Sequence, residues 1–386
     1  MKPANQVFSD ARVTVFETMS RLAAEYGSIN LGQGFPDDLG PQELRDRAAE
    51  AIVRGPSQYP PMMGLPDLRQ AVADHNRRFY GLEVDWQRET MITSGATEAI
   101  CDCLMALIEP GDEVVLIEPL YDCYLPLVRR AGGIPRLVRI APPGWELPRQ
   151  QLADAFTDKT KLILLNSPHN PAAKVFSRDE LQFIADLVMQ YDAYAVCDEV
   201  YEHIVYDDHR HLPLMTFDGM RERCIRIGSA GKTFSMTAWK VGYVTAPAHL
   251  LTPISKAHQY VTFTTPSHLQ SAVAYGLGQG DEYFSGLVDD LAAKRDLISD
   301  GLTDAGFDVM AVAGTYFLSV DIRSVGWRQG DVRFCETITR EAGVTAIPMS
   351  AFYQQADISH FARFCFSKND LILRDACERL KRYFSR

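Results

Sequence analysis

The chain lacks an excess of basic residues and lacks long apolar runs. Its 39 Lys and Arg residues against 50 Asp and Glu residues give a formal net charge of −11, which argues against nucleic acid or an anionic membrane as the main partner. No stretch reaches the roughly 18 apolar residues that a membrane-spanning helix needs. The first residues, MKPANQVFSDAR, contain no apolar core of the signal-peptide type. We therefore expect a protein that binds neither nucleic acid nor membranes.

The sequence also lacks CxxC pairs, internal repeats, low-complexity tracts and long linkers. Several of the eight cysteines lie in apolar runs such as AVCDE, which is typical of reduced, buried thiols and indicates a cytoplasmic protein. Three histidines, His203, His209 and His211, lie near acidic residues in YEHIVYDDHRH, but their spacing suits no standard metal triad. We interpret that stretch as a solvated loop. The sequence therefore predicts neither disulfides nor a metal site.

Short apolar segments alternate with helical patterns through the middle of the chain. The apolar segments are TMIT, EVVLIE, KLILLN, AYAVCD and CIRIGS. This alternation predicts an α/β fold with a mainly parallel sheet and helices on both faces. Ligands of such sheets bind beyond the carboxyl ends of the strands. We expect that edge of the sheet to carry Ser94, Gly95, Ala96, Thr97, Tyr121, Asn170, Asp198, Tyr201, Ser229 and Lys232.

The pattern changes after about residue 285, and 386 residues exceed what one hydrophobic core usually serves. The stretch GLVDDLAAKRDLISDGL has apolar residues on one helical face. Three strand-like segments follow it, GTYFLSVDI, GVTAIPM and ARFCFS. We therefore predict a large α/β domain over 45–285 and a smaller α+β domain formed by 1–44 and 286–386. The cleft between them is the expected place for a small-molecule site.

The segment SAGKTF contains a lysine, Lys232, that sites of two kinds could use. The phosphate-binding loop of nucleotide hydrolases requires a glycine five residues before Gly231, and this chain has Arg226 there. Without that glycine the loop cannot wrap its amides around a triphosphate. The other use is as an amine nucleophile toward a carbonyl group. A solvated lysine at a strand–helix turn is the plain structural alternative to both.

Asp198 and a candidate anion site bear on this choice. Asp198 ends the apolar run AYAVC, where a carboxylate is costly to bury unless it is paired; it could cap the next helix or pair with a protonated heterocycle. The stretch SGATEAI offers free amides at a helix N-terminus for an anion, to which Ser229 and Lys240 could add a hydroxyl and an ammonium group. Tyr121 could lie against a flat ring. A phosphate, a flat ring, a basic ring nitrogen and a carbonyl occur together in pyridoxal 5′-phosphate.

The sequence resembles class I aminotransferases of fold type I over essentially its whole length. It is most similar to the branch that holds kynurenine/glutamine transaminases and bacterial methionine aminotransferases. The matching stretches are INLGQGFPD, QYPPMMGLPDLR, SGATEA, EPLYDCY, NSPHNP, CDEVYEH, SAGKTFSMTAWKVGY, GTYF and RFCFSK. This resemblance implies the fold-type I architecture, pyridoxal 5′-phosphate as cofactor, and a homodimer with its active site at the subunit interface.

The resemblance also implies roles around the cofactor ring. Lys232 looks like the lysine that binds the cofactor covalently, and Asp198 like the partner of the pyridinium nitrogen. The phenolic oxygen of the ring would accept hydrogen bonds from Asn170 and Tyr201, while Tyr121 stacks on the ring. Lys232, Asp198 and Tyr201 are therefore the expected catalytic residues.

Further positions match the groups that hold the phosphate and the substrate. The phosphate would be held by Ala96, Thr97, Ser229 and Lys240. Tyr59 in SQYPPM is similar to the tyrosine that family members lend to the phosphate across the dimer interface. The substrate α-carboxylate would be bound by Arg363, with Gly34 and Asn170 beside it. A planar guanidinium group suits a carboxylate in bidentate geometry, although most arginines on strands are simply solvated.

The chain departs from the family pattern in two places. NPAAK has Ala173 where the family often has glycine, a difference that bears on the turn but leaves Asn170 in place. FPDD stands where FPDF is commoner, so we expect one aromatic side chain near the substrate entrance to be missing. Phe263 in VTFTTPS is expected to line the pocket for the substrate side chain.

The implied reaction is a ping-pong transfer of an amino group from an L-amino acid to a 2-oxo acid, in which Lys232 moves the Cα proton. No second arginine can be assigned to a side-chain carboxylate, so we expect neutral, sulfur-containing or aromatic substrates such as methionine, glutamine, phenylalanine or kynurenine. A cysteine-conjugate C–S β-lyase, or a biosynthetic enzyme such as N-succinyldiaminopimelate or aspartate aminotransferase, is the alternative. A regulator that only senses the cofactor is disfavoured, since the residues before INLGQG are not basic.

Overall fold

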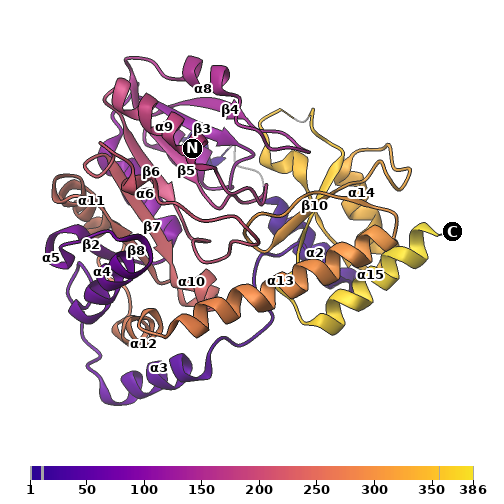
Figure 1. Cartoon of the computed structure of the whole chain (residues 1–386), viewed down its shortest axis with the longest axis horizontal. Helices are drawn as coiled ribbons and strands as arrows, with labels where there is room; N and C mark the ends of the chain where they lie inside the picture. The colour runs from indigo at the N-terminus through magenta and orange to yellow at the C-terminus, as the bar shows by residue number, and fades with distance from the viewer. Residues whose placement is uncertain (1, 10–12, 356, 386) are drawn as a thin grey trace.

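A seven-stranded sheet lies at the centre of the larger part of the molecule (Figure 1). The computed structural model describes residues 2–9, 13–355 and 357–385, so residues 1 and 10–12 of the N-terminal stretch discussed above lie outside the described residues. The strand order is β2-β8-β7-β6-β5-β3-β4. The strands are β2 (Thr90–Thr93), β3 (Glu113–Glu118), β4 (Ile134–Arg139), β5 (Thr160–Asn166), β6 (Tyr194–Asp198), β7 (Cys224–Ser229) and β8 (Gly242–Thr245).

The sheet is mixed and mainly parallel, as predicted. Only β8 runs antiparallel to its neighbours, β2 and β7, while the other pairs are parallel. The sequence prediction did not include β4 or β8. Strand β4 lies at an edge and only one of its six residues is buried, so its sequence lacks the apolar run of the central strands. Strand β8 has four residues and follows directly after a short helical turn.

Helices cover both faces of this sheet because alternate residues of its strands point to opposite sides. Val115 and Ile117 of β3 belong to the core on the side of α9 (Arg178–Gln190). Val114 and Leu116 belong to a second core with α6 (Ala96–Leu107) and α11 (Ala248–Val261). The remaining helices of this part are α3 (Gln42–Arg54), α4 (Pro66–Tyr80), α5 (Trp86–Glu89), α7 (Tyr124–Arg130), α8 (Arg149–Ala155), α10 (Ala230–Thr233) and α12 (Ser267–Leu277), with short turns η1 (Leu214–Thr216) and η2 (Thr237–Trp239).

A four-stranded antiparallel sheet, β12-β13-β10-β9, organises the smaller part. Its strands are β9 (Asp308–Val309), β10 (Phe317–Asp321), β12 (Ile347–Pro348) and β13 (Phe361–Cys365). The segment GVTAIPM, predicted as one strand, divides in two: β11 (Val344–Thr345) pairs instead with β1 (Ile29–Asn30). The helical elements are α13 (Asp281–Asp304), α14 (Asp331–Thr337), η3 (Ile338–Ala342), η4 (Met349–Phe352) and α15 (Asp370–Phe384).

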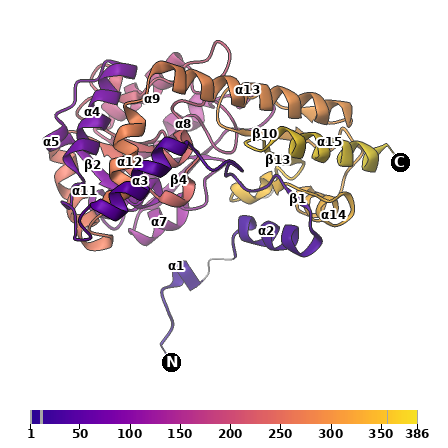
Figure 2. The same ribbon diagram turned by 90° about the horizontal axis from the view of Figure 1, so that it is seen from below.

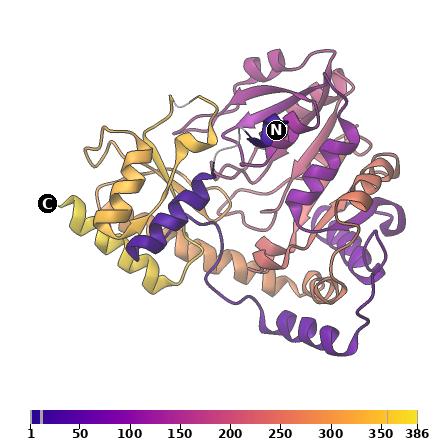
Figure 3. The same ribbon diagram turned by 180° about the vertical axis from the view of Figure 1, so that it is seen from behind.

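The N-terminal segment reaches the smaller part before the chain enters the larger one. Helix α2 (Val15–Tyr26) packs on α14, β11 and β12, and Figure 3 shows it lying against the C-terminal elements. The short helix α1 (Gln6–Ser9) contacts α7 (Tyr124–Arg130) of the larger part and lies at the N-terminal end of the chain in the view of Figure 2. The predicted boundaries 44/45 and 285/286 both fall inside helices, α3 and α13. Figure 1 shows α13 running from one part to the other.

Two further predictions concerned the state of the cysteines and the presence of membrane-spanning helices. All eight cysteines lie in the described ranges and are free thiols, and six of them are buried. None of the described helices combines the length and the apolar character that crossing a membrane requires.

Candidate active site

Most of the predicted site residues converge on one cavity of about 370 Å³. The cavity lies at the carboxyl ends of the central strands and also receives residues of the N-terminal segment, β10 and β13. Tyr59 and Phe263, which were also predicted as site residues, do not line it. Those that do are Gly34, Ala96, Thr97, Tyr121, Asn170, Asp198, Tyr201, Ser229, Lys232, Lys240 and Arg363.

One corner of the cavity is built to hold an anion. Helix α6 begins after Gly95, whose φ of 82° favours glycine, and the amides of its first turn have no partner within the helix. A Cβ built on Gly95 would lie 3.2 Å from Nζ of Lys240, so this ammonium group lies against the start of the helix. Oγ of Ser229 accepts a hydrogen bond from an amide of α10 at 3.2 Å, which leaves its proton for a ligand. A helix N-terminus beside an ammonium group favours a phosphate.

Asp198 provides a buried carboxylate at the end of β6. The hydroxyl of Tyr124 donates to Oδ2 of Asp198 at 2.5 Å, and the amide of Val200 donates to Oδ1 at 3.4 Å. Burial raises the pKa of Asp198, and these two hydrogen bonds and the charge of Lys232 oppose the rise. A cationic group on a ligand would stabilise the ionised carboxylate. Sequence reasoning missed Tyr124, although it belongs to the matching stretch EPLYDCY.

Lys232 lies half-buried on the cavity wall in the short helix α10. Its Nζ donates a hydrogen bond to the hydroxyl of Tyr316 at 3.0 Å. Burial lowers the pKa of Lys232 to about 8, although Asp198 acts to raise it. The amine therefore exchanges its proton near neutral pH, as a nucleophile or a base must. Tyr316 was not predicted as a site residue; the stretch GTYF that contains it was the available signal.

Arg363 is fully buried and its guanidinium group is only partly satisfied by the protein. Nη1 donates to Oδ1 of Asn170 at 2.8 Å and Nη2 to the carbonyl of Gly32 at 2.9 Å, while Nε has no partner. The guanidinium lies 4.0 Å from the centroid of the Phe317 ring. Burial lowers the pKa of Arg363 to about 10, so it is charged at neutral pH. A buried cation with an unpaired donor suits a carboxylate ligand.

Glycine at position 34 and two tyrosines complete the walls of the cavity. A Cβ on Gly34 would lie 2.6 Å from the Phe317 ring, so a larger residue would displace the support of Arg363. Tyr201 is buried, and Nζ of Lys232 lies 5.4 Å from its ring centroid. Tyr121 lines the cavity from the turn after β3. Burial raises the pKa of both phenols, which keeps them protonated as hydrogen-bond donors.

Tyr59 and Phe263 lie away from the cavity of their own chain. Their ring centroids are 5.4 Å apart in an edge-on contact. Tyr59 is 83% exposed and Phe263 is 38% exposed. Neither lines the cavity, so a single chain does not bring them to the other site residues.

The two departures from the family pattern have local explanations. Ala173 adopts a left-handed φ of 55°, which costs a non-glycine residue about 1–2 kcal/mol. Its carbonyl accepts hydrogen bonds from the amides of Ala313 and Gly314 at 2.9 and 3.0 Å, so the turn is held without glycine. In the FPDD stretch the departing residue is Asp38, whose Oδ1 accepts a hydrogen bond from the amide of Gly40 at 2.8 Å, so its side chain holds the turn that follows.

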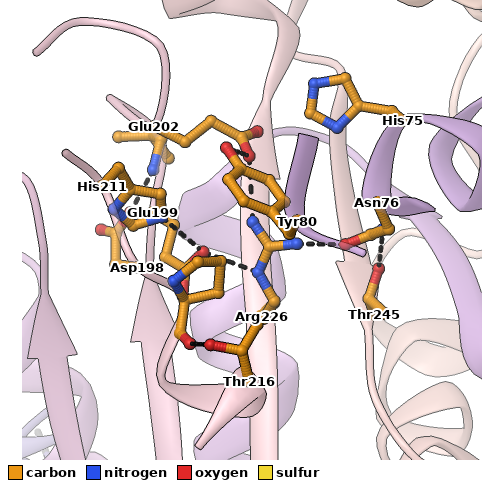
Figure 4. A network of polar contacts seen from close by, with 12 residues as sticks. His75, Asn76, Tyr80, Asp198, Glu199, Glu202, His211, Thr216, Arg226 and Thr245 are labelled. Carbon is orange, nitrogen blue, oxygen red and sulfur yellow. Dashed lines mark hydrogen bonds and ion pairs between the residues drawn. The ribbon is translucent and has the colours of Figure 1, made fainter. Parts of the chain in front are cut away.

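The stretch from 201 to 211 is not a solvated loop throughout, and that prediction is wrong for two of its three histidines. His211 is buried, and its Nε2 lies 2.9 Å from a carboxylate oxygen of Glu199. His203 is half-buried, with Nε2 2.7 Å from Nε2 of His75. His209 alone is exposed. The apolar residues between the histidines turn this stretch inward, and Figure 4 shows the buried polar network that His211 joins.

Known proteins resemble this chain over nearly its whole length. The family model described as aminotransferase class I and II matches residues 26–380. A probable N-succinyldiaminopimelate aminotransferase of Mycobacterium tuberculosis is 44% identical over 378 residues, covering 95% of each chain. Human kynurenine–oxoglutarate transaminase 1 is 36% identical over 397 residues, covering 94% of each. An Escherichia coli structure reported with a methionine aminotransferase function has a TM-score of 0.95 and 37% identity, covering 99% of this chain and 100% of the other.

Proposed function

We propose a specific function from one premise: the chain belongs to the family of class I and II aminotransferases and is an aminotransferase. The predicted resemblance, fold class and enzyme class are thereby confirmed. We propose that it uses pyridoxal 5′-phosphate to move an amino group between an L-amino acid and a 2-oxo acid. One observation carries this: a single cavity brings together Lys232, the carboxylate of Asp198 and the anion corner at Lys240.

The chemistry of these groups fits the cofactor. The anion corner at α6 and Lys240 would hold its phosphate, Asp198 its ring nitrogen, and Lys232 its carbonyl carbon. Tyr201 and Asn170 would donate to its phenolic oxygen, and Tyr121 would stack on the ring. When bound, pyridoxal 5′-phosphate supplies an electron sink for charge that develops at the substrate Cα.

Three residues would act on the amino acid. Arg363 would bind the α-carboxylate, since its guanidinium is buried and has a donor without a partner. Gly34 leaves room beside it. Lys232 has a pKa of about 8, so a fraction of its amine is neutral at pH 7. The neutral amine would take the proton from Cα of the substrate and deliver it to the carbon that was the carbonyl carbon of the cofactor. Such positioned proton transfer contributes about 10²–10⁴-fold to a rate.

We further propose a homodimer in the cytoplasm. Tyr59 and Tyr260 are each 83% exposed, and Phe263 lies beside Tyr59. Exposed aromatic groups of this kind are typical of protein interfaces. In a dimer Tyr59 would reach the phosphate of the neighbouring site, and Phe263 would line its side-chain pocket. The free thiols agree with a reducing compartment.

The substrates that we propose are neutral, sulfur-containing or aromatic amino acids, with the names of the relatives as support. The relative from Mycobacterium tuberculosis makes a biosynthetic substrate the second candidate. The test measures the first half of the reaction, the transfer of the amino group to the cofactor. Each amino acid is added to the cofactor-loaded enzyme and the visible absorbance of the cofactor is recorded. We expect methionine, glutamine, phenylalanine or kynurenine to bleach it and a 2-oxo acid to restore it. Bleaching by no amino acid would disprove the function.

Asp122 is expected to disfavour substrates with a second carboxylate. The charged residues that line the cavity are Asp198, Lys232, Lys240, Arg363 and Asp122, and only Asp122 has no role above. It also lines the adjoining cavity of about 990 Å³, where the substrate side chain would extend. Removing a like charge at this junction in Asp122→Asn should lower KM for glutamate about fivefold.

The same variant should leave KM for methionine unchanged, because a neutral side chain feels little of the charge. The ratio of kcat/KM for glutamate and methionine, measured for both proteins, reports the effect. An equal change for both substrates would show that Asp122 acts on the fold of the turn and not on specificity.

A further inference from the structure

The phenol of Tyr316 connects the reactive lysine to the segment beside the substrate-binding arginine. Nζ of Lys232 donates to the Tyr316 hydroxyl at 3.0 Å, and that hydroxyl donates to the carbonyl of Gly34 at 2.8 Å. The Tyr316 side chain is buried, with 1% of the residue exposed. The two contacts join α10 of the larger part to the N-terminal segment through a residue just before β10.

The arrangement of protons makes Tyr316 an acceptor toward Lys232. A phenol has one O–H proton, and here that proton is directed to the Gly34 carbonyl, which can only accept. The remaining lone pairs of the hydroxyl face the amine. Burial raises the pKa of Tyr316 well above its usual value, so the phenol keeps its proton throughout the neutral range. Tyr316 therefore stabilises the protonated amine and fixes the direction in which Nζ points.

The backbone before Tyr316 is held in an uncommon conformation. Thr315 has a φ of 67°, which is an outlier for a β-branched residue and costs about 1–3 kcal/mol. Three hydrogen bonds hold it: its amide donates to the carbonyl of Ile204 at 2.9 Å, the Tyr206 hydroxyl donates to its carbonyl at 2.7 Å, and the Phe317 amide donates to its Oγ1 at 3.2 Å. Strain of this kind persists where the surroundings over-determine it, and it is concentrated at functional sites.

The neighbouring residues Tyr316 and Phe317 contact two different site residues, the reactive lysine and the arginine proposed to bind the substrate. Phe317 lies under the guanidinium of Arg363, at 4.0 Å from the ring centroid, while Tyr316 contacts Lys232. The turn at Thr315 thus sets the position of the amine and of the arginine together.

We propose that Tyr316 is a positioning residue for Lys232, which fixes the free amine for proton transfer and ties it to the Gly34 segment beside Arg363. The proposal rests on the proposed function, in which Lys232 carries the proton of Cα. A tyrosine that only fills space would need its ring and not its hydroxyl. The ring packs on Tyr201 at 5.3 Å and on Phe317 at 4.9 Å between centroids, and phenylalanine would preserve both contacts.

The test is Tyr316→Phe, with Tyr353→Phe as matched control. Tyr353 also has a buried hydroxyl that donates to a backbone carbonyl, that of Ile140 at 3.0 Å, but it does not contact Lys232. In the cofactor-free full chain, labelling of Lys232 by acetic anhydride is measured against pH by mass spectrometry. The labelling midpoint of the wild type is expected near 8. Loss of an acceptor for the charged amine should lower it by about half a unit or more in Tyr316→Phe and leave it unchanged in Tyr353→Phe.

A second measurement separates positioning from binding. In the cofactor-loaded enzyme, Tyr316→Phe should lower kcat about 10- to 100-fold, because a misdirected amine loses alignment with Cα, while KM for the amino acid changes less than about threefold. A midpoint and a kcat equal to those of Tyr353→Phe would overturn the proposal. The labelling result does not depend on turnover, so it distinguishes this failure from failure of the proposed function, in which the wild type transfers no amino group.

Discussion

The variant Lys232→Ala is expected to lose transamination by about 10⁴-fold or more in kcat/KM. The lysine contributes both the amine that the cofactor carbonyl requires and the group that moves the Cα proton, and proton transfer alone accounts for about 10²–10⁴-fold. The structure adds a reason why another group cannot take over this role. Lys232 lines the cavity together with Lys240, but the Lys240 ammonium lies against Gly95 at the start of α6.

The measurement is single-turnover transfer from methionine, with cofactor retention followed in parallel. Lys240→Ala is the matched control, because it removes a lysine from the same segment and the same cavity. That control should lose the cofactor more readily, yet at saturating cofactor keep kcat within about tenfold of the wild type. Retained turnover in Lys232→Ala, or equal losses in the two variants, would mean that the reactive lysine is misassigned.

The sequence was sufficient for the parts of the fold that repeat a simple rule. The middle residues of central strands such as β5 and β6 are apolar because both faces of the strands are buried, and polar residues lie at the carboxyl ends of the strands. Edge strand β4 is mostly not buried, so it lacks this apolar pattern. The change from the turn η2 to strand β8 is made by the left-handed backbone at Lys240. Local patterns do not report these features.

The limits for the candidate site have the same physical origin. Asp198 ends an apolar run, where burial of its charge demands a partner, so its position in the sequence indicates a ligand. The roles of Lys232 and Arg363 follow from the resemblance to the family, since a lysine at a strand–helix turn and an arginine on a strand are most often solvated. Tyr316 and Tyr124 act through single hydroxyl groups, and their sequence neighbourhoods are those of ordinary core tyrosines. Only the tertiary contacts with Lys232 and Asp198 give them a place in the site. His211 was misjudged for a related reason, because its partner Glu199 is twelve residues away.

Arg226, which stands where a phosphate-binding loop would require glycine, is the centre of a buried ion network (Figure 4). Its Nε donates to Glu199 at 2.6 Å and its Nη2 to Glu202 at 3.0 Å, and Nη1 contacts Asn76. Glu202 also accepts hydrogen bonds from Tyr80 and Tyr243, at 2.7 and 3.1 Å. The network begins at Glu199, the residue after Asp198, so it supports the end of β6 from behind the cavity.

The variant Arg226→Met is therefore expected to lower the free energy of unfolding by about 3–5 kcal/mol, because it leaves two carboxylates buried without their cation. Urea unfolding of the full chain measures the change. Arg77→Met is the control: its ion pair with Asp74 at 2.6 Å is exposed, and such pairs contribute less than about 1 kcal/mol.

Neutralising one of the stranded carboxylates tests the cause directly. The pKa of Glu202 lies well below its usual value, with the charges of His75 and Arg226 both acting to lower it against burial, so Glu202 is ionised in the folded protein. Adding Glu202→Gln to Arg226→Met should recover part of the lost stability, since the glutamine removes a buried charge, its amide oxygen accepts from one of the two tyrosines, and its amide NH2 donates to the hydroxyl oxygen of the other. A double variant with a lower free energy of unfolding than Arg226→Met would contradict this cause. The stability lost in Arg226→Met would then come from the packing of the arginine side chain and not from an unpaired charge.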